Sequence, residues 1–150
     1  MINRLFLIII TGLILYGCSS DPVSTNGGTN GNGYVTVYSN SGTLDSITCG
    51  SIFTNPRSLG NLDFTNSDSV KISLEYIANN TTSYGIRIFY MDGSNEIDLI
   101  NVTIPGNQNT YTSVEFTAPS PGVQKEFLYI MTSDGTNCYF VIRNIILSKK

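Results

Sequence analysis

The feature that most constrains the fold is a series of short segments in which apolar and polar residues alternate along the chain. Such alternation places one set of side chains on each face of a β-strand, so that one face packs on a core while the other meets solvent. We find no convincing amphipathic helix, and the sequence therefore predicts an all-β fold. The clearest segment, residues 69–77, sets Val70, Ile72, Leu74 and Tyr76 against Lys71, Ser73 and Glu75.

Similar segments recur along the chain, and turns rich in Gly, Pro, Asn and Asp separate them. Residues 85–91 and 96–104 flank the sequence Asp-Gly-Ser-Asn at 92–95, which is a β-hairpin signature. About eight short strands at this spacing predict an antiparallel β-sandwich. The further strands are expected at residues 34–39, 49–54, 111–117, 126–132 and 138–147.

The last of these strands changes register in its middle. Phe140 and Ile142 would point inward, followed by Ile145 and Leu147, and this shift requires an extra residue, a β-bulge, around Arg143 and Asn144. An apolar pair, an amide and a further apolar run resemble the closing strand of jelly-roll carbohydrate-binding modules and galactose-binding-like domains. Asn144 matches the amide of that pattern, whereas Arg143 replaces its usual aspartate. The resemblance implies a jelly-roll-like sandwich that binds glycan.

The amino terminus carries an apolar run, residues 5–16, directly behind Arg4. This run is too short to span a bilayer, which takes about 20 apolar residues, but it suits a secretory signal. The sequence Leu-Tyr-Gly-Cys at 15–18 resembles the lipobox of bacterial lipoproteins, although Tyr16 departs from the small residue usual there. The resemblance implies that residues 1–17 are a signal peptide and that Cys18 is lipidated. The alternative is an uncleaved anchor, or an ordinary signal peptide followed by a chance cysteine.

Residues 18–33 contain almost no apolar side chains and four glycines. Such a segment is expected to be a flexible tether with a reach of roughly 20 to 25 Å. Residues 34–150 then form one domain with its own core. In lipoprotein sorting an aspartate directly after the lipidated cysteine favours the inner membrane. Because Ser19 stands there, we expect the outer membrane of a bacterial envelope, with the domain in the periplasm or at the cell surface.

Charge and composition argue against several classes of function. Without Arg4 the chain has seven basic and eleven acidic residues, and the basic ones are scattered, which argues against nucleic acid as a partner. The chain has no histidine, the commonest general base and zinc ligand. Carboxylate pairs for glycoside hydrolysis could come from Glu75, Asp98, Glu115 or Glu126, but any acidic β-protein offers such pairs. We therefore expect a protein without catalytic activity.

A sugar-binding surface needs flat apolar rings together with polar groups for hydroxyls. The aromatic candidates, expected opposite the core or in loops, are Tyr38, Tyr84, Phe89, Tyr111, Tyr129 and Tyr139. The polar candidates are Arg87, Arg143, Glu75, Asn79 and Asn80. The alternative for any single tyrosine is that its ring stabilises cross-strand neighbours.

Calcium is a further candidate ligand, because hard oxygen donors are closely spaced in and after the hairpin turn. The alternative is a solvated turn, since Asp-Gly is an ordinary hairpin sequence. The candidate ligands are Asp92, Asn95, Glu96 and Asp98, together with Ser94.

Lipidation of Cys18 would leave an even pair, Cys49 and Cys138, in an oxidising compartment. A disulfide between them is one interpretation, and two separate buried thiols are the other.

The sequence as a whole thus predicts a membrane-anchored, non-catalytic lipoprotein with a glycan-binding sandwich. The alternative is a structural or adhesive protein that contacts other envelope proteins. A glycan binder should expose two or more tyrosines beside amides and a guanidinium. An assembly protein should instead expose a strand edge or a large apolar patch.

Overall fold

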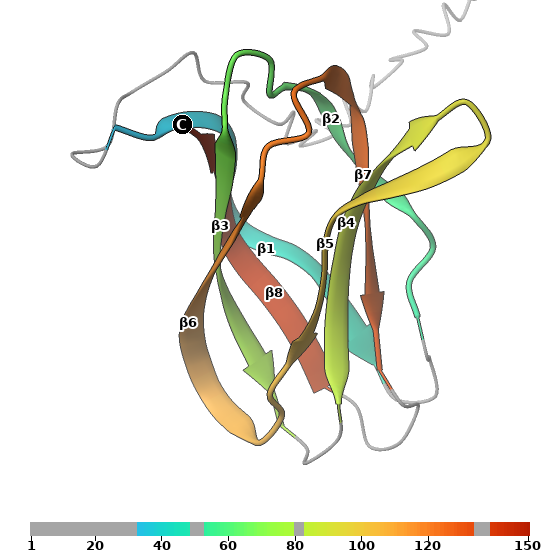
Figure 1. The fold of residues 1–150 in the computed structure, drawn as a ribbon. Helices are drawn as coiled ribbons and strands as arrows, with labels where there is room; N and C mark the ends of the chain where they lie inside the picture. The colour runs from blue at the N-terminus through green and yellow to red at the C-terminus, as the bar shows by residue number, and fades with distance from the viewer. Residues whose placement is uncertain (1–32, 49–52, 80–82, 134–138) are drawn as a thin grey trace, which may run out of the picture.

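Every regular element in the described part of the chain is a β-strand (Figure 1). The computed structural model describes residues 33–48, 53–79, 83–133 and 139–150. Within these ranges no helix has the length and apolar character needed to cross a membrane. The strands are β1 (Val35–Thr48), β2 (Arg57–Asp63), β3 (Ser69–Ala78), β4 (Tyr84–Asp92), β5 (Asn95–Ile104), β6 (Gln108–Pro119), β7 (Gln124–Thr132) and β8 (Tyr139–Lys149). The prediction of an all-β fold of about eight strands is confirmed.

The strands form two antiparallel sheets of four strands each. The first sheet has the order β1-β8-β3-β6, and the second has the order β2-β7-β4-β5. Most connections pass from one sheet to the other, and only β4 and β5 are joined as a hairpin within one sheet. This strand order is that of a jelly roll, so the predicted jelly-roll-like sandwich is confirmed.

The core lies between the two sheets and follows the predicted alternation. On β3 the side chains of Val70, Ile72, Leu74 and Tyr76 are buried, and those of the polar set between them are half-buried. The facing sheet contributes Ile86 and Ile88 from β4 and Phe127 from β7. Phe64, directly after β2, packs edge-on against Phe127 with ring centroids 5.0 Å apart. Each fully buried side chain of this size contributes about 1.5–3 kcal/mol of hydrophobic free energy, which holds the sheets together.

The bulge predicted in β8 is present. Phe140, Ile142, Ile145 and Leu147 are all fully buried, which requires the change of register between the two pairs. The extra residue falls at Asn144, whose φ of 50° is in the left-handed region. Both neighbouring ladders shift register here, between Asn40 and Thr43 on β1 and between Ser73 and Glu75 on β3. The bulge turns Asn144 and Ile146 to the outer surface of the first sheet.

The predicted hairpin is also present, with Asp92 opposite Asn95. Gly93 has a φ of 64°, which a side chain would strain, and this explains the Asp-Gly sequence at the turn. In Figure 1 the hairpin projects beyond the rest of the second sheet. Met91 and Ile97 near its tip are exposed.

The first two strands differ from the prediction. Strand β1 does not end near residue 39 but continues to Thr48, because the polar residues 39–43 form bulges against β8 instead of a turn. Of the strand expected at 49–54, residues 49–52 lie outside the described ranges, and Phe53 forms only an isolated bridge to Thr132. The second strand begins at Arg57, directly after Pro56, and is short and bulged at Gly60.

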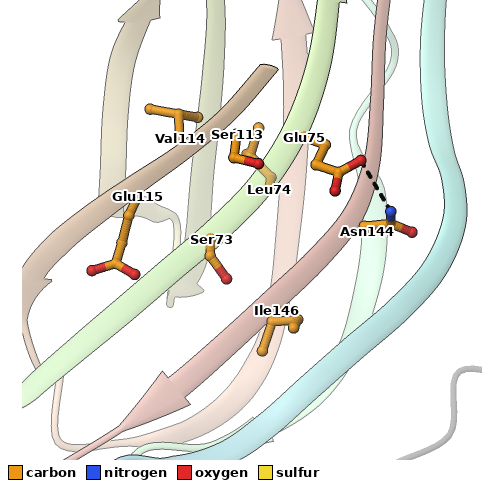
Figure 2. Close-up of a pocket in the computed structure, with 8 residues that line it drawn as sticks. All are labelled: Ser73, Leu74, Glu75, Ser113, Val114, Glu115, Asn144 and Ile146. Carbon is orange, nitrogen blue, oxygen red and sulfur yellow. Dashed lines mark hydrogen bonds between the residues drawn. The ribbon is translucent and has the colours of Figure 1, made fainter. Parts of the chain in front are cut away.

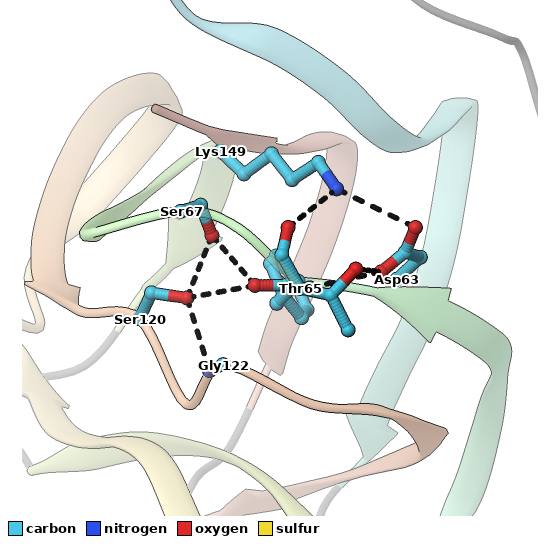
Figure 3. Close-up of polar contacts among 7 residues, drawn as sticks. Asp63, Thr65, Ser67, Ser120, Gly122 and Lys149 are labelled. Atoms are coloured by element: carbon cyan, nitrogen blue, oxygen red, sulfur yellow. Dashed lines mark hydrogen bonds and ion pairs between the residues drawn. The ribbon is translucent and has the colours of Figure 1, made fainter.

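A network of side chains fixes the turn between β2 and β3 at one end of the sandwich (Figure 3). Asp63 accepts hydrogen bonds from the Thr65 amide at 2.8 Å and from its hydroxyl at 2.6 Å, and these bonds lower the pKa of Asp63. The Lys149 ammonium donates to the Thr65 carbonyl at 3.1 Å and lies 3.5 Å from the Asp63 carboxylate. The hydroxyl of Ser67 donates to the Phe64 carbonyl at 2.7 Å. The end of β8 is thereby tied to the β2–β3 turn.

Candidate functional site

The outer surface of the first sheet carries two adjoining hollows. The first has a volume of about 360 Å³ and is lined from β3, β6 and β8 (Figure 2). The second has a volume of about 340 Å³ and is lined by Ser39, Asn40 and Ser41 of β1 together with β8. Asn144 and Ile146 line both hollows. We call the two hollows together the cross-strand groove, because in the order β1-β8-β3-β6 they extend from one edge of the sheet to the other. Its lining side chains on the far side are Ser73, Glu75, Ser113 and Glu115, with Leu74 and Val114 between them.

Three polar side chains at the groove are bonded to one another. The Arg143 Nε donates to Glu75 Oε2 at 2.7 Å, and Asn144 Nδ2 donates to the same oxygen at 3.1 Å. Asn144 Oδ1 accepts a hydrogen bond from the Gly42 amide of β1 at 2.9 Å. This Glu75–Arg143–Asn144 network therefore links β1, β8 and β3. Figure 2 shows Glu75 and Asn144 pointing toward each other across the sheet.

An exposed aromatic ring adjoins this network. The Arg143 guanidinium carbon lies 3.3 Å from the ring centroid of Tyr111 on β6, a cation–π contact. Tyr111 is 36% exposed. The structure therefore brings together Tyr111, Arg143 and Glu75, three residues that were separate candidates for a sugar-binding surface.

Tyr139, the first residue of β8, is the second exposed tyrosine among the sugar-binding candidates, and it is 45% exposed. Asn79 is bonded to its backbone, accepting from the Tyr139 amide at 3.2 Å and donating to its carbonyl at 3.3 Å. Asn79 thus binds the backbone at the start of β8. Asn80 lies outside the described residues. Neither residue lines the two hollows of the groove.

The other nominated aromatics are buried, so the expectation that they face solvent is wrong. Tyr38, Tyr84, Phe89 and Tyr129 are each at most 5% exposed. Tyr84 shares its face of the strand with Ile86, and Tyr129 shares its face with Phe127, so the period of two directs both rings into the core. Tyr38 also belongs to the core, because a register shift between Thr36 and Tyr38 turns it inward.

Phe89 is buried, but it does not belong to the cluster of core residues between the two sheets. The guanidinium of Arg87 lies 4.5 Å from the centroid of its ring. Arg87 is on β4 of the second sheet, so the structure separates it from Arg143. Its guanidinium binds Glu96 and also Asp98 at 2.6 Å, and these partners raise the pKa of Arg87, Glu96 first.

The acidic residues of the hairpin are paired with cations of the protein. Glu96 and Asp98 both contact Arg87, and Asp92 lies 3.5 Å from the ammonium of Lys125. Asn95 lies opposite Asp92 in the hairpin ladder. Among the described residues no three His, Cys, Asp or Glu side chains gather closely enough to hold a metal ion. These ion pairs and the lack of such a group in the described part of the chain give the calcium expectation no support, and it stays a prediction.

Sequence reasoning missed most of the residues that line the groove. The sequence Ser-Asn-Ser at 39–41 has the composition of a turn. Ile146 stands in an apolar run and was therefore expected in the core. The signal for Ile146 was the bulge itself: once Ile145 and Leu147 point inward, Ile146 must point outward.

All three cysteines lie outside the described residues. The lipidation predicted for Cys18 and the disulfide predicted between Cys49 and Cys138 stay predictions. The residues next to that pair are described: Thr48 at the end of β1 lies opposite Tyr139 at the start of β8.

Comparisons with known proteins give distant similarities. No family model and no curated protein sequence matches the chain. A family 4 carbohydrate-binding module is 15% identical with a TM-score of 0.48, over 79% of this chain and 72% of that one. A carbohydrate-binding module of lichenase 5A from Cellvibrio mixtus, solved with cellotriose, is 14% identical with a TM-score of 0.43, over 87% and 91% of the two chains.

An adhesin domain is similar to a comparable degree. The K3 cleaved adhesin domain of Lys-gingipain from Porphyromonas gingivalis is 8% identical with a TM-score of 0.46, over 77% of this chain and 73% of that one. A shared fold does not establish a shared ligand, so a function must be argued from the groove.

Proposed function

We propose that the protein is a glycan-binding module that holds its ligand in the cross-strand groove. The observation that carries this proposal is the mixture of groups on one open surface. Serine hydroxyls and amides suited to sugar hydroxyls surround an exposed apolar side chain, Ile146, and an aromatic ring, Tyr111, stands beside them. Sugar rings present both hydroxyls and an apolar C–H face, and sites that bind them combine the same two kinds of group.

The same proposal assigns the groove a binding role without catalysis. Its two carboxylates are engaged by cations: Glu75 by Arg143 at 2.7 Å and Glu115 by Lys71 at 3.3 Å. A glycosidase needs one carboxyl group as proton donor and a second as base or nucleophile. We assign Glu75 instead to holding Arg143 and Asn144 in place.

Membrane anchoring is the second half of the proposal. It rests on the lipobox-like residues 15–18 and the tether-like composition of residues 18–33. The intact mass of protein purified from bacterial membranes should correspond to a chain that begins at a lipidated Cys18. A mass for the unprocessed chain, or for a mature chain without lipid, would contradict this half alone.

A glycan array probed with the full-length protein in detergent tests the binding half. We expect binding to a subset of uncharged glycans and a loss of signal in Ser73→Trp, whose large side chain would fill the first hollow. Ile97→Ala is a matched control, because Ile97 is as exposed as Ile146, at 38%, but lies on the hairpin of the second sheet. Silence of the unmodified protein across plant, host and bacterial glycans would reject glycan binding.

A role in protein contacts is the second candidate, and the edge strand β6 favours it. Strand β6 is 12 residues long, pairs only with β3 and carries a single charged residue, Glu115. Long edge strands with few charges are open to pairing with another chain. A silent array together with concentration-dependent self-association would favour this candidate.

A further inference from the structure

The two hollows of the cross-strand groove are separated by one pair of side chains. Asn144 and Ile146 line both hollows, with β1 on one side and β3 and β6 on the other. Adjacent strands lie about 4.8 Å apart, so three spacings from β1 to β6 give a groove on the order of 14 Å long. That length exceeds one sugar ring. A ligand that contacts both hollows must therefore be a chain of units.

Ile146 forms the apolar centre of this groove. It is 38% exposed, whereas Ile145 and Leu147 on either side are fully buried. In the two ladders of β8, Ile146 lies opposite Ser39 of β1 and opposite Ser73 of β3. An apolar side chain with a serine on each side in register matches one pyranose ring, whose C–H face rests on the isoleucine while hydroxyls at its rim reach the serines.

The charges along the groove indicate which chains it accepts. Arg143 binds Glu75 and stacks on Tyr111, and Lys71 pairs with Glu115. Among the described residues that line or adjoin the groove, each cation thus already has a carboxylate partner. A carboxylated or sulfated sugar would have to displace one of these pairs and would be repelled by the acid released. An uncharged sugar needs no such exchange.

We propose that the groove binds an internal segment of an uncharged, linear polysaccharide that lies across the strands, with units on both sides of Asn144 and Ile146 and one ring on Ile146. This inference rests on the proposed glycan-binding function and defines the class of glycan. Ile146 determines affinity through the central ring, and the serines of β1 and β6 determine the length that is recognised.

The test is a titration of the full-length protein with oligosaccharides of increasing length. The probes are glucose, xylose, mannose and galactose oligomers of one to six units, with oligogalacturonates of the same lengths as charged counterparts. We expect affinity to rise at least tenfold between one and three units of a neutral series. In amide NMR spectra, signals from both Asn40 and Ser113 should shift, because these residues lie in opposite hollows.

Two variants separate the role of Ile146 from a general effect on folding. Ile146→Ala should weaken binding of the neutral oligomer roughly fivefold, while Ile97→Ala, equally exposed but distant, should leave it unchanged. Both variants should keep the thermal midpoint of the parent protein to within a few degrees.

The outcomes distinguish the two levels of the proposal. Binding that saturates with a single sugar unit, shifts confined to one hollow, or tighter binding of the oligogalacturonates would overturn the chain-binding inference and leave a glycan-binding function standing. No binding by any probe, neutral or charged, together with a silent glycan array, would overturn both.

Discussion

At the scale of single residues, the most consequential buried polar contact is that of Tyr129. Its hydroxyl donates to Asp45 Oδ2 at 3.3 Å, and Asp45, itself only 6% exposed, also lies 3.2 Å from Arg57 at the edge of the second sheet. Burial and the negative charge of Asp45 raise the pKa of the Tyr129 phenol, and burial also raises the pKa of Tyr38. Both hydroxyls therefore stay protonated in the folded state up to a higher pH than the hydroxyl of free tyrosine.

These raised pKa values predict that the protein loses stability in alkali. A phenol whose pKa is raised by folding stabilises the fold fully below the unfolded value of about 10, and this contribution is lost as the pH rises above it. Urea unfolding at pH 8 to 11.5 should therefore show a falling free energy of unfolding from about pH 10. Tyr129→Phe should cost about 1 kcal/mol at pH 7 but flatten the alkaline fall, and Tyr38→Phe should flatten it in part. An alkaline fall in Tyr129→Phe as steep as in the parent would contradict this assignment.

At the scale of single elements, β8 was the strand whose irregularity could be predicted from the sequence. The inward-facing apolar residues of β8 change from even-numbered to odd-numbered positions, and only a bulge keeps both sets on the same face. The bulge occurs where it was expected. Strand β1 was predicted poorly, because residues 39–43 have the composition of a turn and only pairing with β8 makes them strand. Tyr84 and Tyr129 were misplaced because tyrosine suits both core and surface.

The bulge in β8 depends on the backbone at Asn144, and a pair of substitutions isolates that dependence. Asn144→Gly and Asn144→Ala both remove the amide that binds Glu75 and Gly42, but only alanine is strained at the φ of 50°. We expect the glycine variant to be more stable than the alanine variant by about 1 kcal/mol in urea unfolding. Equal stability, or a more stable alanine variant, would show that β8 does not hold this conformation.

At the scale of the whole molecule, the chain enters and leaves the sandwich at the same end. The ring of Tyr34 lies beneath the ammonium groups of Lys71 and Lys150, at 5.1 Å and 5.7 Å, and its hydroxyl is 3.3 Å from that of Ser69. In Figure 1 the start of β1 and the C-terminus lie side by side. The opposite end of the first sheet carries the paired residues Thr48 and Tyr139. In the sequence Cys49 directly follows Thr48, and Cys138 directly precedes Tyr139.

This strand pairing gives the predicted disulfide a specific stability effect. A bond between Cys49 and Cys138 would close a loop of about 90 residues and stabilise the fold by roughly 4 kcal/mol in the chain-entropy model. Reductant should therefore lower the urea midpoint of the parent protein, whereas the double variant Cys49→Ser, Cys138→Ser should have the lower midpoint with or without reductant. Alkylation of the unfolded, unreduced protein supplies the decisive control. If iodoacetamide labels both Cys49 and Cys138 before reduction, the two residues are separate thiols, and β1 and β8 are held together by their ladder and the core alone.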